Sequence, residues 1–213
     1  MPKGFSPEVP YKTAEELLVY LARISNPGNQ DNMETAPNLI NFLIRNKHWS
    51  PFEMVDMIVE ITTSRAIAAQ ILRHRSFVFQ EFSQRYSKVS EFEDVEIREA
   101  GSKNRQGSLG VVNPFLGYGF GTATEAIKRH IEQSQSLYEE LIEGGVAKES
   151  ARMVLPLTTR TSLYMKGSLR SWIHYLEVRT DAHVQKEHRQ IAEEIKKIFC
   201  EQFPYIAAAL NWI

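Results

Sequence analysis

The stretch Arg73-His74-Arg75-Ser76-Phe77-Val78-Phe79-Gln80-Glu81-Phe82-Ser83-Gln84-Arg85-Tyr86 carries the densest chemistry of the chain. Its three arginines share a single acidic residue, Glu81. The aromatic neighbours indicate that these polar groups are partly buried, and buried charges must be paired or must face a charged ligand. Because arginine binds phosphate with two parallel hydrogen bonds, the stretch predicts an anion site, most simply for a phosphate.

Local geometry predicts which polar side chains of this stretch lie on the same face. It begins at the end of a predicted helix that Ser64 opens, where a cationic cluster could also simply complement the helix dipole. Helical spacing places three side chains on one face: Gln70, Arg73 and His74. If the chain then extends, alternation places three more on one side: Glu81, Ser83 and Arg85.

Upstream of this stretch, the patterns predict two helices, a loop and a strand. After an irregular segment at residues 1–12, Thr13-Ala14-Glu15-Glu16 reads as a capping box that opens a helix, and a second helix starts near Pro37. Pro51 favours a non-helical loop after Lys47. From Asp56 to Thr62, apolar and polar residues alternate, which predicts a half-buried strand.

Downstream, the helical patterns dominate. Thr122-Ala123-Thr124-Glu125 is a second capping box, opening a helix that ends at Gly144-Gly145. The remaining predicted elements are a short edge strand within 91–99, a long loop at 101–121, a short helix at 147–155, a strand at 159–165, and helices at 169–180 and 184–202. The expected fold class is α+β: one domain, residues 1–213, with a central, mostly antiparallel sheet flanked by long helices.

Composition restricts the function classes. The chain has 213 residues, 43% of them hydrophobic, and this is enough for one good core. A formal net charge of −1 provides no general basic field for nucleic acid. The six histidines form no Cys/His cluster, so no metal is expected. One cysteine, no signal segment and no membrane-spanning run indicate a soluble, cytoplasmic protein.

These residues carry a resemblance to the flavin-dependent (alternative) thymidylate synthases. Arg-His-Arg, seven residues, Ser and then Arg-Tyr is similar to that family's signature, although Val78 and Gln80 depart from its fuller form. His48-x-Ser50-Pro-Phe-Glu53 also resembles the family. So does the segment from Ser168 to Glu187, where Ser168 and Val184 depart. The resemblance spans nearly the whole chain in the same order.

The resemblance implies an enzyme that converts deoxyuridylate (dUMP) to thymidylate (dTMP). Methylenetetrahydrofolate would donate the carbon, and FADH2, regenerated by NADPH, would donate the hydride. It also implies a homotetramer with sites shared between subunits. Sharing would account for the arginines of helix 169–180, which point to different sides and can hardly serve one pocket within one subunit.

The resemblance also implies the site residues. The dUMP site would comprise Gln70, Ile71, Leu72, Arg73, Glu81, Phe82, Ser83, Gln84, Arg85, Arg152 and Arg179. The FAD site would comprise Ser50, Glu53, Arg73, His74, Arg75, Glu81, Ser168, Leu169, Arg170 and His174. His48 would lie near the folate and the flavin, if it is not simply a surface loop histidine. Arg179 would be catalytic by favouring loss of the uracil N3 proton, and a structural salt bridge is the alternative role for it.

Other functions stay open at this level. The chain could be another FAD-dependent reductase, or a non-catalytic nucleotide or RNA binder that uses the arginines between 73 and 85. A thymidylate synthase that adds a cysteine thiolate to the uracil is disfavoured, because Cys200 lies on a predicted amphipathic helix with no evident activating base. Ser83 has no Ser-His-acid order to make it a nucleophile.

Overall fold

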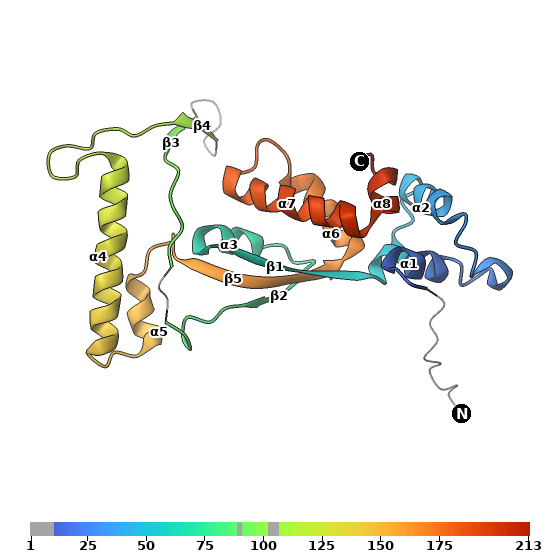
Figure 1. The fold of residues 1–213 in the computed structure, drawn as a ribbon, viewed down its shortest axis with the longest axis horizontal. Coiled ribbons are helices and arrows are strands. Elements are labelled where there is room, and N and C mark those ends of the chain that lie inside the picture. The colour runs from blue at the N-terminus through green and yellow to red at the C-terminus, as the bar shows by residue number, and fades with distance from the viewer. Residues whose placement is uncertain (1–10, 89–90, 102–106) are drawn as a thin grey trace. The chain divides into compact units, whose positions relative to one another are not determined.

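The computed structural model describes residues 11–88, 91–101 and 107–213 (Figure 1). The first ten residues of the predicted irregular segment therefore lie outside the described part. The chain divides into two compact units. The first comprises the described residues up to Ile58 with Lys166–Thr180 and Gln190–Ile213, and the second comprises Val59–Met165 and Asp181–Arg189.

The first unit is helical. Its elements are α1 (Ala14–Ala22), η1 (Pro27–Asn29), α2 (Ala36–Arg45), η2 (Ser50–Glu53), α6 (Leu169–Arg179), α8 (Pro204–Ala209) and the part of α7 (Lys186–Gln202) from Gln190 onward. The capping box at the start of α1 is confirmed, since Thr13 and Glu16 exchange both hydrogen bonds. The loop expected around Pro51 is wrong: proline is accepted in the first turn of a helix, and Ser50–Glu53 forms a 3-10 turn.

The core of the first unit is built around α6. Trp172, Tyr175 and Leu176 are fully buried on this helix. The indole Nε1 of Trp172 donates to the carbonyl of Met57 at 3.0 Å, so the buried ring has its polar atom satisfied. The backbone N–H of Leu169 donates to the carbonyl of Val55 at 2.9 Å, which fixes where the helix begins.

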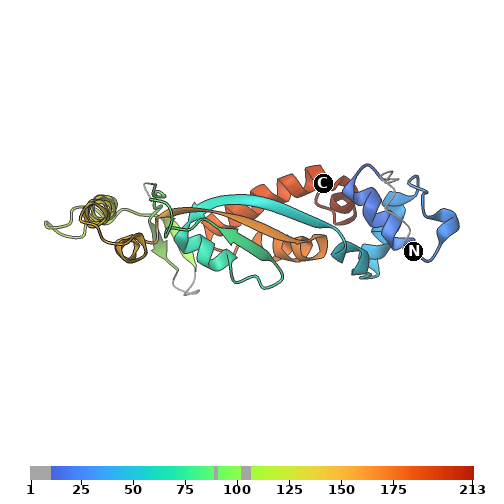
Figure 2. The same cartoon turned by 90° about the horizontal axis from the view of Figure 1, so that it is seen from below.

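Most of the main sheet belongs to the second unit, although the residues before Val59 and after Met165 in two of its strands belong to the first. The strands of this sheet are β1 (Asp56–Ser64), β5 (Arg160–Ser168) and β2 (Val78–Glu81), in the order β1-β5-β2, and β1 and β5 run side by side in opposite directions (Figures 1 and 2). The alternation predicted for β1 is confirmed, because every second residue from Met57 onward is buried. Helix α3 (Arg65–Ile71) follows directly, with Ser64 at its N-cap.

A second, smaller sheet was not predicted, although its first strand overlaps the edge strand expected within 91–99 at residues 98 and 99. Strands β3 (Arg98–Ala100) and β4 (Ser108–Val111) pair antiparallel, with Arg98 opposite Val111. The loop expected over 101–121 is therefore wrong at β4, and part of that segment, residues 102–106, lies outside the described residues. A strand of three or four residues, all of them exposed in β4, is too short to show the alternation that identified β1.

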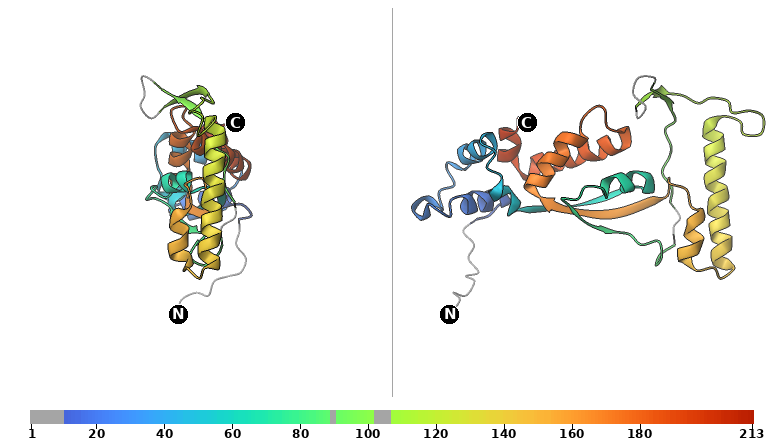
Figure 3. Two further views of the ribbon diagram at one scale, coloured as in Figure 1. Left: turned by 90° about the vertical axis from the view of Figure 1, so that its left-hand side faces the viewer. Right: turned by 180° about the vertical axis from the view of Figure 1, so that it is seen from behind.

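The second unit also contains the long helix. α4 (Ala123–Glu143) lies beside α5 (Lys148–Ala151) in both views of Figure 3, and η3 (Arg152–Val154) follows α5. The predicted capping box is confirmed, with the N–H of Thr122 donating to Glu125 Oε2 at 2.8 Å. The predicted short helix before Pro156 is confirmed as α5 and η3.

The fold is thus α+β, with small antiparallel sheets and eight α-helices within the described ranges. In the same part of the chain, no helix is long and apolar enough to span a membrane. Nor do His, Cys, Asp or Glu side chains of these residues gather in a group of three that could hold a metal ion.

One buried carboxyl joins the two ends of the first unit. Glu15 is 3% exposed, and its Oε1 accepts a hydrogen bond from the backbone N–H of Ile206 at 2.8 Å. Burial raises the pKa of Glu15 to about 6, although the backbone hydrogen bonds from Ile206 and Tyr205 act in the opposite direction. The folded protein therefore binds this proton more tightly than the unfolded chain does.

A pH-dependent stability difference follows for Glu15→Gln. A raised carboxyl pKa stabilises the fold below the unfolded value near 4.5, and this contribution is lost as the pH rises through about 6. Between pH 4.5 and pH 7, the free energy of unfolding of the variant should therefore gain about 2 kcal/mol relative to wild type. Urea unfolding of both proteins across this range measures the difference. Glu16→Gln controls for loss of a glutamate elsewhere on α1, and a difference independent of pH for Glu15→Gln would contradict the assignment.

Candidate active site

The 73–86 stretch follows α3 in the second unit. Helix α3 ends at Ile71. Beyond it, the N–H groups of Arg73 and His74 donate to the carbonyls of Gln70 and Ile71, three residues earlier, at 3.3 and 3.1 Å. Strand β2 ends at Glu81. The predicted helical face is therefore wrong beyond Gln70, because the helix ends at Ile71, and the predicted extension holds only as far as Glu81, since a turn follows at residues 84–86.

Glu81 is held by an arginine from outside the stretch. Arg65, the first residue of α3, donates from Nη1 to Glu81 Oε1 at 2.5 Å and from Nη2 to Gln84 Oε1 at 3.0 Å. The hydroxyl of Thr161 on β5 donates to the same Glu81 oxygen at 3.1 Å. Arg65 was not among the site residues predicted from the sequence. The signal available in the sequence was the position of Arg65, directly after the N-cap residue Ser64 and before a stretch with few acidic residues.

The three arginines of the stretch have no such partner. Arg73, Arg75 and Arg85 are exposed, and none forms an ion pair or side-chain hydrogen bond with any described residue. Arg65, Arg98 and Arg160, by contrast, each pair with a glutamate. The arginines predicted to hold anions are thus left uncompensated within the described chain.

Backbone donors gather at the same place. The N–H groups of Ser83, Gln84 and Arg85 make no hydrogen bond within the described residues, while the carbonyl of Ser83 accepts from the N–H of Tyr86 at 3.1 Å. Successive unpaired N–H groups in a turn form a concavity suited to an anion. These backbone donors lie within two residues of the exposed Arg85.

The other residues of this unit that were predicted to bind dUMP differ in how accessible their side chains are to a ligand. Gln70 bonds to Gln185 and His188, and Arg152 donates Nε to the carbonyl of Glu149 at 3.3 Å. The side chain of Ile71 is fully buried, so only its backbone could meet a ligand. Leu72 and Phe82 are exposed, and Ser83 is half-buried.

A pocket of about 200 Å³ opens beside this stretch. Its lining is Thr62, Phe82, Lys88, Glu91, Arg160, Thr161 and Ser162. Phe82 alone among the predicted site residues contributes to it. The arginines and backbone donors locate the anion site better than this hollow does, because they carry the charge complementary to a phosphate.

In the first unit, Glu53 of η2 accepts hydrogen bonds from two residues at the start of α6. Its Oε2 accepts from the Ser168 hydroxyl at 2.6 Å, and its Oε1 accepts from Arg170 NH1 at 2.9 Å. Ser168 is also the N-cap of α6, accepting from the N–H of Ser171 at 3.4 Å. Three predicted FAD residues are therefore in one hydrogen-bonded cluster, which fixes the Arg170 guanidinium at the helix surface.

The remaining predicted residues of this unit surround that cluster in different ways. His174 lies one turn after Arg170 and is exposed, as are Ser50 and His48. The ring of His48 packs edge-on against Phe42, with centroids 5.7 Å apart. Leu169 is fully buried, so its side chain belongs to the core.

Arg179 ends α6 and is half-buried, next to the fully buried Tyr175. Burial raises the pKa of the Tyr175 phenol well above its ordinary value, and the Arg179 guanidinium acts in the opposite direction. The phenol is therefore neutral, and it does not cancel the charge of the arginine.

Cys200 lies on α7 and is half-buried. Burial raises the pKa of its thiol, although Lys196 opposes this. Because the thiolate is the nucleophilic form, a raised pKa makes Cys200 a poor nucleophile.

Comparisons with known proteins show the family to which the chain is related. The family model described as thymidylate synthase complementing protein matches residues 9–205. A flavin-dependent thymidylate synthase of Synechocystis sp. is 55% identical, over 93% of this chain and 90% of the relative. A probable flavin-dependent thymidylate synthase of Paramecium bursaria Chlorella virus 1 is 50% identical, over 94% of this chain and 92% of the relative.

A solved structure shares the fold. The crystal structure of the UMP/dUMP methylase PolB from Streptomyces cacaoi, bound with 5-Br dUMP, aligns with a TM-score of 0.76 over 94% of this chain and 92% of that chain, at 24% identity.

Fold and sequence together define an enzyme class rather than a binding module. The chain belongs to the flavin-dependent thymidylate synthase family. The resemblance drawn from the sequence is thereby confirmed. The alternatives of an unrelated FAD-dependent reductase and of a non-catalytic nucleotide or RNA binder are not favoured.

Proposed function

We propose that this chain converts dUMP to dTMP, and that the arginines between residues 73 and 85 hold the phosphate groups of its ligands. The observation that carries the proposal is the absence of any carboxylate partner for Arg73, Arg75 and Arg85 among the described residues. Exposed guanidinium groups in one short segment fit a nucleotide phosphate and the diphosphate of a dinucleotide.

For dUMP, we assign the phosphate to Arg85 and Arg73 and to the backbone around Ser83. The unpaired N–H groups of residues 83–85 support this, since they can surround phosphate oxygens. Gln70 and Arg152 complete the proposed set, with Ile71, Leu72, Glu81, Phe82 and Gln84 contributing backbone atoms or shape. Glu81 serves this set by fixing the chain, because Arg65 and Thr161 already donate to it.

For FAD, we assign two groups of residues. In the second unit these are Arg73, His74 and Arg75, with Glu81 as their support. In the first unit they are the Glu53 cluster with Ser168, Leu169 and Arg170, followed by His174 and Ser50. An exposed arginine held in place by a carboxylate and beside a helix N-cap suits a flavin diphosphate. Bound FAD, reduced by NADPH, supplies the hydride that completes the methyl group, and methylenetetrahydrofolate supplies the carbon.

Arg179 is the proposed catalytic residue. A guanidinium stabilises the uracil anion formed when the N3 proton leaves, and it does so without losing its own proton. Arg179 lies next to Tyr175, whose phenol stays neutral because burial raises its pKa. His48 is assigned to the vicinity of the folate and flavin.

Assembly and location complete the proposal. Arg170 and Arg179 are nine residues apart on α6, which at 3.6 residues per turn puts them on opposite faces. Such an arrangement supports sites shared between the subunits of a homotetramer. The single free cysteine is consistent with a reducing, cytoplasmic compartment.

The purified protein tests this function directly. It should carry or take up FAD, seen in its visible absorption spectrum, and should produce dTMP from dUMP when methylenetetrahydrofolate and NADPH are supplied. Cys200→Ala is the control for the cysteine-dependent route and should keep nearly full turnover. A protein that binds no FAD would refute the assignment, and a folded, flavin-loaded Cys200→Ala without turnover would restore the thiolate route.

Arg179→Lys tests the catalytic assignment. The lysine keeps the charge but loses the planar fork that matches the N3 and carbonyl edge of the uracil. Turnover should fall roughly 10²–10³-fold, as when one preorganised electrostatic group is removed, while flavin content and NADPH oxidation without nucleotide persist. Arg160→Lys, a change at an exposed ion pair with Glu91, is the matched control. Normal turnover in a flavin-loaded Arg179→Lys protein would exclude Arg179 from the mechanism, whereas loss of the flavin or of folding would indicate a structural salt bridge.

A further inference from the structure

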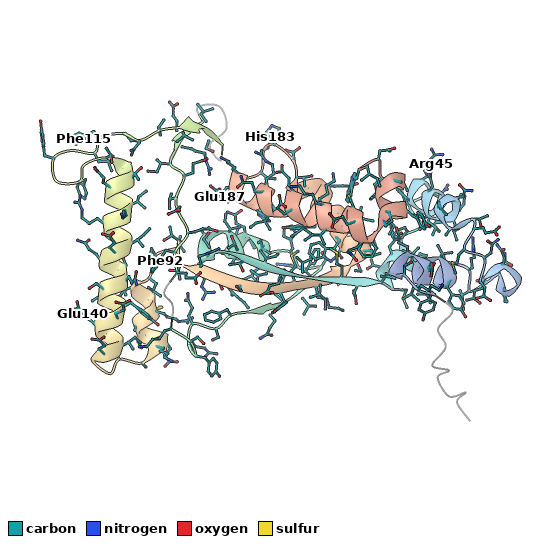
Figure 4. The ribbon with its side chains drawn as sticks, in the orientation of Figure 1. Arg45, Phe92, Phe115, Glu140, His183 and Glu187 are labelled. Atoms are coloured by element: carbon teal, nitrogen blue, oxygen red, sulfur yellow. The ribbon has the colours of Figure 1, made fainter. Side chains whose placement is uncertain are left out.

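A line of hydrogen bonds in the second unit runs from β3 to the end of α3. Arg98 Nη2 donates to Glu187 Oε1 at 2.6 Å, and Gln185 Nε2 donates to Glu187 Oε2 at 3.0 Å. Gln70 Nε2 donates in turn to Gln185 Oε1 at 2.7 Å, and Gln70 Oε1 lies 3.3 Å from Nδ1 of His188. Figure 4 shows Glu187 at the start of α7, with His183 on the loop before it.

The carboxylate of Glu187 determines which atom of each glutamine amide along this line donates and which accepts. Burial alone would raise the pKa of Glu187, but hydrogen bonds from its own backbone, from Gln185 and from Arg98, with the Arg98 charge, hold that pKa below its ordinary value. A carboxylate only accepts hydrogen bonds, so Gln185 must present its NH2 group to Glu187 and its carbonyl oxygen to Gln70. Gln70 must then turn its own NH2 toward Gln185 and its carbonyl oxygen toward His188.

The consequence reaches a buried histidine. His188 is fully buried, and the atom that faces its Nδ1 is a carbonyl oxygen, which only accepts. Nδ1 must therefore carry a proton. The ring of His188 lies edge-on to the ring of His74, with centroids 6.3 Å apart, so the line ends beside a residue of the Arg-His-Arg segment.

We propose that Arg98, Glu187 and Gln185 are positioning residues that fix the direction of the Gln70 amide and keep a proton on Nδ1 of His188. The part that concerns nucleotide binding rests on the proposed function, in which Gln70 contacts dUMP. A Gln70 amide held in one orientation offers its remaining N–H and lone pair to a ligand in one fixed arrangement, which lowers the entropic cost of binding. Glu96 also pairs with Arg98, at 2.9 Å, but has no place in the line.

The isosteric change Glu187→Gln should reverse the line. Its carbonyl oxygen would take the hydrogen bond from Arg98, and its NH2 group would face Gln185. Gln185 and Gln70 would then each turn over, and the NH2 of Gln70 would meet Nδ1 of His188, which must accept and so lose its proton. Gln185→Ala interrupts the line at an exposed position without unpairing Arg98 and should leave Nδ1 free to lose the proton.

Nitrogen-15 NMR of ligand-free protein labelled at its six histidines reads this protonation directly. Wild type and the matched control Glu96→Gln should show a protonated Nδ1 on His188, and both Glu187→Gln and Gln185→Ala should show it deprotonated in a sizeable fraction. An unprotonated Nδ1 in wild type, or one that stays protonated in both variants, would overturn the proposal. Because no substrate is present, this result does not depend on the proposed function.

Calorimetric titration with dUMP reads the positioning role. The dissociation constant should rise about ten-fold in Glu187→Gln and in Gln185→Ala, as expected when one hydrogen bond to a ligand is turned away, and should stay within about two-fold of wild type in Glu96→Gln. Unchanged flavin content and melting temperature in Gln185→Ala separate this effect from unfolding. Unchanged dUMP affinity in both variants would overturn the positioning role, whereas a wild type that binds no dUMP would instead refute the proposed function.

Discussion

The pairing of Arg65 with Glu81 is the contact on which the candidate site depends. Glu81 is the one acid among the arginines of the 73–86 stretch, and Arg65, from the first turn of α3, occupies it at 2.5 Å. The two side chains are 25% and 21% exposed, so water and salt screen them less than a surface pair. Since Arg65 also holds Gln84, it fixes the far end of the stretch to the start of α3. Arg73, Arg75 and Arg85 have no acidic partner among the described residues and keep their charge for a ligand.

In the first unit, a carboxylate likewise fixes the position of an arginine. Glu53 accepts from both Ser168 and Arg170 and so sets the position where α6 begins. In each unit, an acid from a short element fixes one arginine. The two pairs differ in the role of the arginine. Arg170, which Glu53 holds at the surface, is itself a predicted ligand residue, whereas Arg65, which pairs with Glu81, is not. A framework of paired charges with unpaired cations around it is the expected design of a site for anions that arrive and leave.

The sequence predicted the elements whose signals are local. Capping boxes at Thr13 and Thr122 depend on side chains three residues apart, and strand β1 depends on strict alternation, so each could be recognised from residue spacing. What failed depends on contacts distant in sequence. Strand β4 exists because β3 pairs with it, and the partner that Arg65 would take was not visible in any spacing. The unpaired state of the arginines could be suspected from the shortage of acids, but only the fold shows that Glu81 is already occupied.

Binding of dUMP to Arg85→Ala tests whether the unpaired arginines of the 73–86 stretch hold the phosphate. The account predicts a dissociation constant about 10- to 100-fold above wild type, the loss expected when a charge-assisted hydrogen bond to phosphate is removed. FAD should remain bound, because the flavin is assigned to other residues, and Arg160→Ala, which removes an arginine already paired with Glu91, should bind dUMP like wild type. An Arg85→Ala protein that binds dUMP as tightly as wild type would contradict the account.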